Sequence, residues 1–303
     1  MGALQGRLSP DAGNRADASA RALGIPRAVI GFAVVFVVLP LALTIAVSFW
    51  TRVGLLVRPA FTFTSYEAFF AGARLLVLER SFLASIEATV LSLLLAYPIA
   101  YFLAFKVSPR AARTILLLFT VPFLVNYIIR AFAWTWLLGR TGLINTLLMA
   151  AGLTNEPLDW LLYSDVAVLI GLVTSYMPFM IFPLWLSLSG IDQRLIQASW
   201  MLGAPPARTF VRVTLPLSLP GVFAAAIFAF VGCFGESAIP VIMGGVGYQM
   251  TGNSIASAMD VLNYPLAAAI STVVLGAMMS LLLVWYLAFD ARAFLGMILR
   301  PGK

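Results

Sequence analysis

The chain has no histidine and only one cysteine, Cys233, among its 303 residues. Histidine is the side chain that most often acts as a general base or binds a metal near neutral pH, so both roles lose their usual carrier. The lone cysteine can form no disulfide within the chain, and it has no histidine partner to activate it as a nucleophile. These absences argue against a hydrolase and against a histidine-ligated metal centre.

Sequence motifs for ATP binding and for hydrolysis are also missing. The chain contains no G-x-x-x-x-G-K-[ST], no H-E-x-x-H and no G-x-S-x-G. It also has no connection between apolar segments long enough to form an extracellular domain that captures a solute. We therefore expect no cofactor bound by this chain and no enzymatic activity of its own.

Charge is scarce, and apolar residues dominate. Charged residues make up 10% of the chain, against about a quarter in soluble domains. Apolar residues make up 62%, and the mean hydropathy is +0.99. About 20 apolar residues are needed to cross the hydrocarbon core of a bilayer, and six segments qualify. The sequence therefore predicts an all-α membrane protein with six transmembrane helices. They are Val29–Phe49, Phe82–Phe105, Thr114–Leu138, Val166–Leu188, Leu217–Ile242 and Ala267–Phe289.

The basic residues predict the side of the membrane on which each connection lies. Thirteen Lys and Arg fall in the N-terminal tail, the second and fourth connections and the C-terminal tail, whereas five fall in the other three connections. The positive-inside rule places the richer set in the cytoplasm. We expect residues 1–28 to be a disordered cytoplasmic tail, 29–290 a membrane domain and 291–303 a second cytoplasmic tail. The net charge of +7 then reflects orientation in the lipid bilayer and indicates no nucleic acid.

The fourth connection, residues 189–216, is polar and cytoplasmic by this rule. Its apolar residues recur with spacings of four, three and four, which predicts a short helix that carries them on one face. Gly203 follows the last of them, and glycine often ends a helix because it accepts a left-handed conformation. The residues on the predicted face are Ile191, Leu195, Ala198 and Leu202.

The same connection carries a spaced motif. Gln197-Ala198-Ser199 is followed by Gly203 and then by Leu215-Pro216, with the spacings of the cytoplasmic EAA loop of ABC-importer permeases, which this segment resembles. Gln197 and Ser199 replace a glutamate and an alanine of that pattern, which affects a salt bridge through position 197 but not the docking geometry. The resemblance implies a loop that couples the chain to a separate ATPase. Its residues here are Ile191, Leu195, Gln197, Ala198, Ser199, Leu202, Gly203, Leu215 and Pro216.

The likeness extends over roughly residues 29–290. Asn126-Tyr127-Ile128-Ile129-Arg130 and the segment from Gly235-Glu236 to Gly244-Gly245 resemble the third and fifth spans of spermidine/putrescine permeases of the first-subunit type. The resemblance implies the type I ABC importer permease fold in a bacterial inner membrane, with both termini in the cytoplasm. It implies three partners: a second, similar permease subunit, a cytoplasmic ABC ATPase dimer that holds ATP and Mg, and a periplasmic solute-binding protein. The implied solute is a polyamine, with an amino-acid derivative, an opine or an organophosphonate as alternatives.

Three ionisable residues, Glu87, Arg130 and Glu236, fall inside the predicted spans. A charge at the bilayer centre costs about 2.5–3.5 kcal/mol on insertion scales, so such residues usually face a bundle interior or a water-filled path. Glu236 could meet a cationic solute or serve as a structural cap, and both interpretations stand. With polar and aromatic neighbours, the candidates for the substrate path are Glu236, Asn126, Tyr127, Arg130, Trp134, Tyr176 and Glu87.

A secondary transporter is the main alternative of a different class. It would use an intramembrane acid such as Glu236 for proton coupling. Such proteins usually contain inverted repeats, and the sequence shows no convincing repeat. The motif in residues 189–216 would also have no role in a secondary transporter.

Overall fold

Helices make up most of the structure. The residues that the computed structural model describes are 31, 32, 34–124 and 126–288, so both predicted tails lie outside them. In chain order the helices are η1 (Val34–Val38), α2 (Leu39–Ser48), α3 (Thr64–Phe70), α4 (Arg74–Phe105), α5 (Pro109–Leu124), α6 (Tyr127–Leu138), α7 (Leu143–Ala150), η2 (Asp159–Leu161), α8 (Asp165–Ser189), α9 (Gln193–Met201), α10 (Pro206–Thr209), η3 (Phe210–Thr214), α11 (Leu215–Phe234), α12 (Ala238–Gly244), α13 (Thr251–Asp260) and α14 (Tyr264–Ala288).

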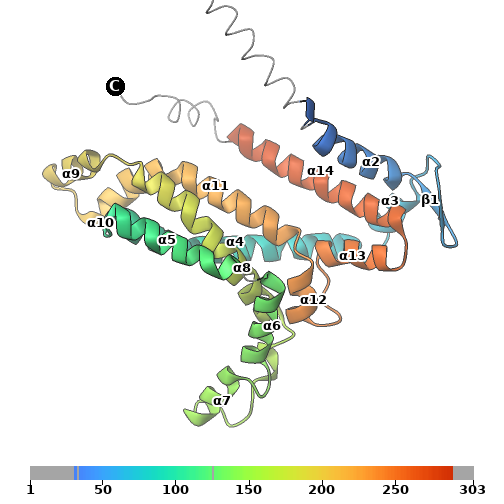
Figure 1. The fold of residues 1–303 in the computed structure, drawn as a ribbon, viewed down its shortest axis with the longest axis horizontal. Helices are drawn as coiled ribbons and strands as arrows, with labels where there is room; N and C mark the ends of the chain where they lie inside the picture. The colour runs from blue at the N-terminus through green and yellow to red at the C-terminus, as the bar shows by residue number, and fades with distance from the viewer. Residues whose placement is uncertain (1–30, 33, 125, 289–303) are drawn as a thin grey trace, which may run out of the picture.

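The helices α4, α8 and α11 pack against one another and form the centre of the molecule. Figure 1 shows them side by side, with α5 running along the same bundle. Small side chains recur every three or four residues along one face of α4, and this allows the helix backbones to approach closely, as is common between helices in membranes. These fully buried residues are Ser85, Ala88, Ser92, Ala96 and Ala100.

Four described helices are long and apolar enough to cross a membrane: Arg74–Phe105, Asp165–Ser189, Pro206–Phe234 and Tyr264–Val284. Val34–Ser48 is apolar but shorter, and the start of the first predicted span, at residues 29 and 30, lies outside the described residues. The prediction of helical spans is thus confirmed for the second, fourth and sixth segments. The count of six stays a prediction.

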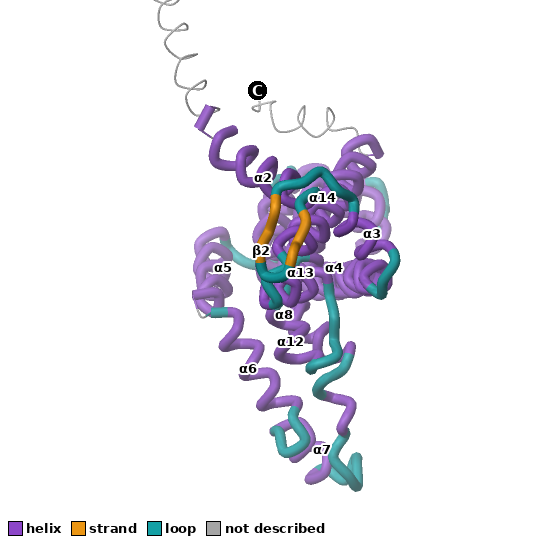
Figure 2. Tube along the Cα trace, turned by 90° about the vertical axis from the view of Figure 1, so that its right-hand side faces the viewer, coloured by secondary structure: helices purple, strands orange, loops and turns teal. Residues whose placement is uncertain are grey.

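The third predicted span, Thr114–Leu138, is wrong as a single helix. The structure divides it into α5, which ends at Leu124, and α6, which begins at Tyr127. Pro122 offers no backbone N–H near the end of α5, and the Asn126 side chain accepts a 2.9 Å hydrogen bond from the N–H of Ile128 at the start of α6. Figure 2 shows α6 leaving the bundle toward α7.

The fifth predicted span, Leu217–Ile242, is also interrupted. The helix α11 ends at Phe234, and α12 begins at Ala238. Glu236 stands in the break and accepts hydrogen bonds from the first backbone N–H groups of α12. A carboxylate suits this place because the N-terminal end of a helix carries partial positive charge.

The remaining elements form a second group around α14. The helix α2 lies along α14, and α3 and α13 contact α14 near the N-terminal end of α14 (Figure 1). Phe69 of α3 is buried there with Leu266 and Ile270, whereas Phe61, Phe63 and Phe70 of the same aromatic segment are exposed. Between α2 and α3 runs an antiparallel hairpin of β1 (Thr51–Val53) and β2 (Leu56–Arg58), visible in Figure 2.

Candidate functional site

The polar loop folds as a short helix between two long ones. Asp192 caps α9, since its side chain accepts a 2.9 Å hydrogen bond from the N–H of Arg194. The helix ends before Gly203, which has a φ of 77° that a residue with a side chain rarely adopts. The predicted helix and its stop at this glycine are therefore confirmed.

The predicted apolar face of this helix is only partly right. Ile191 lies before the Asp192 cap and is buried outside the helix, whereas Leu195 is exposed. The buried residue of α9 is Ile196, which belongs to an apolar cluster with Leu184 and Leu188 near the end of α8. The sequence pattern misses this shift because it assumes that the helix begins at Ile191.

The C-terminal end of α9 presents apolar side chains to solvent. Trp200 is exposed, Met201 is 88% exposed and Leu202 is 87% exposed. Gln197 and Ala198 of the motif are exposed on the same helix. Figure 1 shows α9 at one far end of the molecule, beyond the ends of α8 and α11. Sequence reasoning did not single out Trp200 and Met201, although three successive apolar residues before a helix-ending glycine are a usable signal.

After α9, residues Pro206–Phe234 form one continuous helical stretch, and Leu215-Pro216 lies within it. The π-helical turn η3 comes directly before Leu215. A wider turn at this place relieves the clash between the Pro216 ring and the carbonyl group of the preceding turn. Pro206 stands at the first position of α10, where its missing N–H costs nothing.

Two candidates for the substrate path meet directly. The hydroxyl group of Tyr176 on α8 donates a 2.8 Å hydrogen bond to Oε2 of Glu236. Oε1 accepts from the N–H groups of Ser237 and Ala238, each at 3.0 Å. Protein donors thus occupy both carboxylate oxygens, and Glu236 is only 7% exposed. This geometry favours the structural cap over contact with a solute.

The other candidates lie on α6 and α4. Asn126 caps α6, and Tyr127 and Arg130 are partly exposed on this helix. Trp134 packs against an apolar cluster that contains Val168 and Leu172 of α8. The helix α6 contacts α12, whose first turn Glu236 caps. Glu87 lies apart from this group, exposed on α4.

Glu87 lines a polar hollow between α4 and α8. This hollow has a volume of about 410 Å³, and Glu79, Arg80, Asp165 and Tyr248 also line it. Arg80 donates a 2.7 Å hydrogen bond to Asp165, and its guanidinium carbon lies 4.0 Å from the centre of the Tyr248 ring. Burial, together with the neighbouring Asp165 carboxylate, raises the pKa of Tyr248 to about 12, so its hydroxyl stays protonated at neutral pH. Glu79 was not predicted from sequence.

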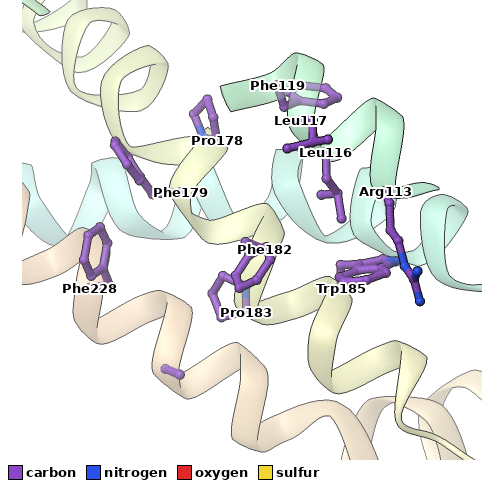
Figure 3. A pocket seen from close by; sticks show the side chains of 11 residues that line it. Arg113, Leu116, Leu117, Phe119, Pro178, Phe179, Phe182, Pro183, Trp185 and Phe228 are labelled. Atoms are coloured by element: carbon purple, nitrogen blue, oxygen red, sulfur yellow. The ribbon is translucent and has the colours of Figure 1, made fainter. Parts of the chain in front are cut away.

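A second hollow, of about 780 Å³, lies between α5, α8 and α11. Figure 3 shows Phe179, Phe182 and Phe228 around it, with Arg113 beside Trp185 at one end. Its lining is apolar apart from Arg113. A surface of this kind offers no carboxylate to a cationic solute, so the two hollows differ in what they can hold.

Sequence relatives point to one class of membrane protein. The chain is 33% identical over 262 residues to the spermidine/putrescine transport system permease protein PotB of Haemophilus influenzae, which covers 86% of this chain and 91% of that protein. It is equally similar to PotB of Escherichia coli K12, over 85% and 94% of the two chains. The inner membrane ABC transporter permease protein YdcU of the same bacterium is 32% identical over 249 residues, or 78% of this chain and 77% of that one.

Solved structures share the fold. A bacterial ABC transporter that imports the acidic polysaccharide alginate contains a chain that matches with a TM-score of 0.70 at 14% identity, covering 92% of this chain and 96% of that one. The same transporter in complex with an alginate pentasaccharide-bound periplasmic protein gives the same score over 95% and 98%. The sequence pattern of binding-protein-dependent transport system inner membrane components matches residues 88–293. The chain therefore belongs to this family and is an inner-membrane permease of a binding-protein-dependent ABC importer.

Proposed function

We propose that α9 is the helix through which this permease is driven by a separate ATPase. The observation that carries the proposal is the exposed apolar end of α9, formed by Trp200, Met201 and Leu202. Large apolar side chains gathered at the tip of a polar connection are typical of an interaction surface. The positive-inside rule, applied to the thirteen basic residues of the richer set, supports a cytoplasmic position for this tip, on the side of the ATPase.

The complete transporter contains parts that this chain lacks. No phosphate-binding loop is present in the sequence, so ATP and Mg are bound by two copies of the partner ATPase. A second permease subunit forms the other half of the path, and a periplasmic protein delivers the solute. Closure of the ATPase pair moves α9, and the helices that follow it rotate to open the path toward the outside.

The solute that fits this chain best is a polyamine. Two relatives at 33% identity are spermidine/putrescine permeases, which supports a linear polycation. Glu79 and Glu87 line the polar hollow two helical turns apart, a rise of about 12 Å along α4. Arg80 is already paired with Asp165. Among the residues described by the structure, neither glutamate forms an ion pair, so both remain available to ammonium groups separated by short methylene chains.

Uptake of labelled spermidine by the complete complex in proteoliposomes tests this function. We expect uptake only with ATP on the ATPase side and with the binding protein present. Glu79→Gln and Glu87→Gln should each raise the KM about three- to five-fold, the loss expected for one exposed charge contact. Glu67→Gln, a change to an exposed glutamate on α3, is the matched control and should leave the KM unchanged. ATP-dependent uptake that excludes spermidine but accepts another solute would refute the polyamine assignment alone.

A further inference from the structure

The coupling helix α9 is joined to α10 by a pair of hydroxyl groups. Oγ of Ser199 lies 2.7 Å from Oγ1 of Thr209. Thr209 is only 4% exposed, so water competes little for this hydrogen bond. The motif that this loop resembles has alanine at the position of Ser199, and alanine could not form the bond. The link therefore depends on Ser199, one of the two positions at which this chain departs from the motif.

The next residue, Phe210, contacts α4. Its ring meets Tyr97 edge-on, with centroids 5.8 Å apart and an interplanar angle of 87°. It meets Tyr101 at 6.0 Å and 74°. Edge-to-face aromatic pairs attract each other beyond what burial alone provides, and they fix the relative orientation of the rings. Phe210 thus attaches the start of η3 to two tyrosines one turn apart on α4.

Tyr97 also contacts α11. Its hydroxyl group lies 2.8 Å from Oγ of Ser218, which is fully buried and donates a 3.0 Å hydrogen bond to the carbonyl oxygen of Leu215. The residue after Tyr97 is Pro98, inside α4. A proline within a helix removes a backbone hydrogen bond and makes bending easier at that point. The contact with Phe210 therefore falls where α4 bends most easily.

We propose that Phe210, positioned by the Ser199–Thr209 hydrogen bond, transmits the displacement of α9 to α4 as well as to α11. The proposal rests on the proposed role of α9 in ATPase docking. Without Phe210, a movement of α9 would still reach the end of α8, whose Leu188 shares an apolar cluster with Ile196, and α11 through η3. Phe210 adds a direct contact with Tyr97 of α4, whose hydroxyl group also links α4 to Ser218 of α11. Phe210 and Ser199 are positioning residues, since neither is placed against ATP or solute.

The experiment uses the complete complex in proteoliposomes and measures solute transported per ATP hydrolysed. Phe210→Ala should retain the ATPase in the purified complex and keep its ATP turnover within about two-fold, while transport per ATP falls about three- to ten-fold, the range expected for loss of a coupling contact. Phe102→Ala is the control, because Phe102 is an exposed aromatic residue next to Tyr101 on α4. It should leave transport per ATP unchanged.

A double-mutant cycle tests the hydroxyl pair. Ser199→Ala and Thr209→Val should each lower transport per ATP by a smaller factor, and the double variant should be no worse than the more affected single variant, because one hydrogen bond is lost in all three. Independent, multiplying effects would refute the role of this bond. Equal transport per ATP in wild type and Phe210→Ala would refute the transmission through Phe210.

The two levels of the proposal fail in different ways. If the wild-type complex contains no ATPase and shows no ATP-dependent uptake, the proposed function is wrong. If wild type is driven by ATP and Phe210→Ala loses ATP turnover and uptake in proportion, Phe210 only supports docking, and the further inference is wrong while the function stands.

Discussion

Gly232 of α11 lies directly beneath the ring of Tyr176 on α8, so closely that a Cβ atom at position 232 would stand 2.2 Å from Cε1 of the tyrosine. This contact lets α8 and α11 approach at the level where Tyr176 reaches Glu236. The position of the Tyr176 side chain is therefore fixed both by packing against Gly232 and by the hydrogen bond to Glu236.

Gly232→Ala should destabilise the protein. The added methyl group must displace the Tyr176 ring, and overpacking of this kind costs about 1–3 kcal/mol. Thermal unfolding of the purified protein measures the effect. Gly276→Ala on α14 is the matched control, because a Cβ there meets open space. Equal unfolding midpoints for the two variants would contradict the close packing of α8 and α11.

Replacing Glu236 separates a cap from a solute contact. Glu236→Leu leaves buried N–H groups of α12 without acceptors, and each unsatisfied group costs about 1–3 kcal/mol. Glu236→Gln keeps one acceptor oxygen and should cost less. Both variants should unfold at lower temperature and retain the KM for solute in whatever complex remains folded. A Glu236→Gln complex of normal stability with a raised KM would instead place Glu236 in the path.

Asp165→Asn should affect transport more than stability. The Arg80–Asp165 pair is exposed at both side chains, and such pairs contribute about 0–1 kcal/mol. The change leaves the positive charge of Arg80 unbalanced in the polar hollow, which repels a cationic solute. We expect an almost unchanged unfolding midpoint with a raised KM for spermidine. A large loss of stability with no change in KM would show that the pair is structural.

The sequence predicted the features that depend on local chemistry. Apolar length predicted spans at Val166–Leu188 and Ala267–Phe289, and the structure has the helices Asp165–Ser189 and Tyr264–Ala288 there. Apolar periodicity predicted a short helix that ends before Gly203, and α9 is that helix. Backbone requirements act over a few residues and leave a readable pattern, as the positive φ of Gly203 illustrates.

Features set by tertiary contacts were not readable in the same way. The break at Glu236 depends on Tyr176, sixty residues earlier, and on the N–H groups of α12. The choice of Ile196 over Leu195 as the buried residue of α9 depends on the position of the Asp192 cap. Hydropathy also extended the third span through Pro122, because a proline changes a mean hydropathy little while it changes backbone hydrogen bonding strongly.

The role of α9 is tested most directly by purifying the tagged chain from its native membrane and measuring how much ATPase accompanies it. Met201→Glu and Leu202→Glu place a charge on the exposed tip, and Val246→Glu does the same at a fully exposed residue between α12 and α13. We expect the ATPase to accompany the wild-type chain and the Val246 variant, and to be lost from both tip variants while the second permease subunit is retained. Full recovery of the ATPase with either tip variant would contradict docking through α9.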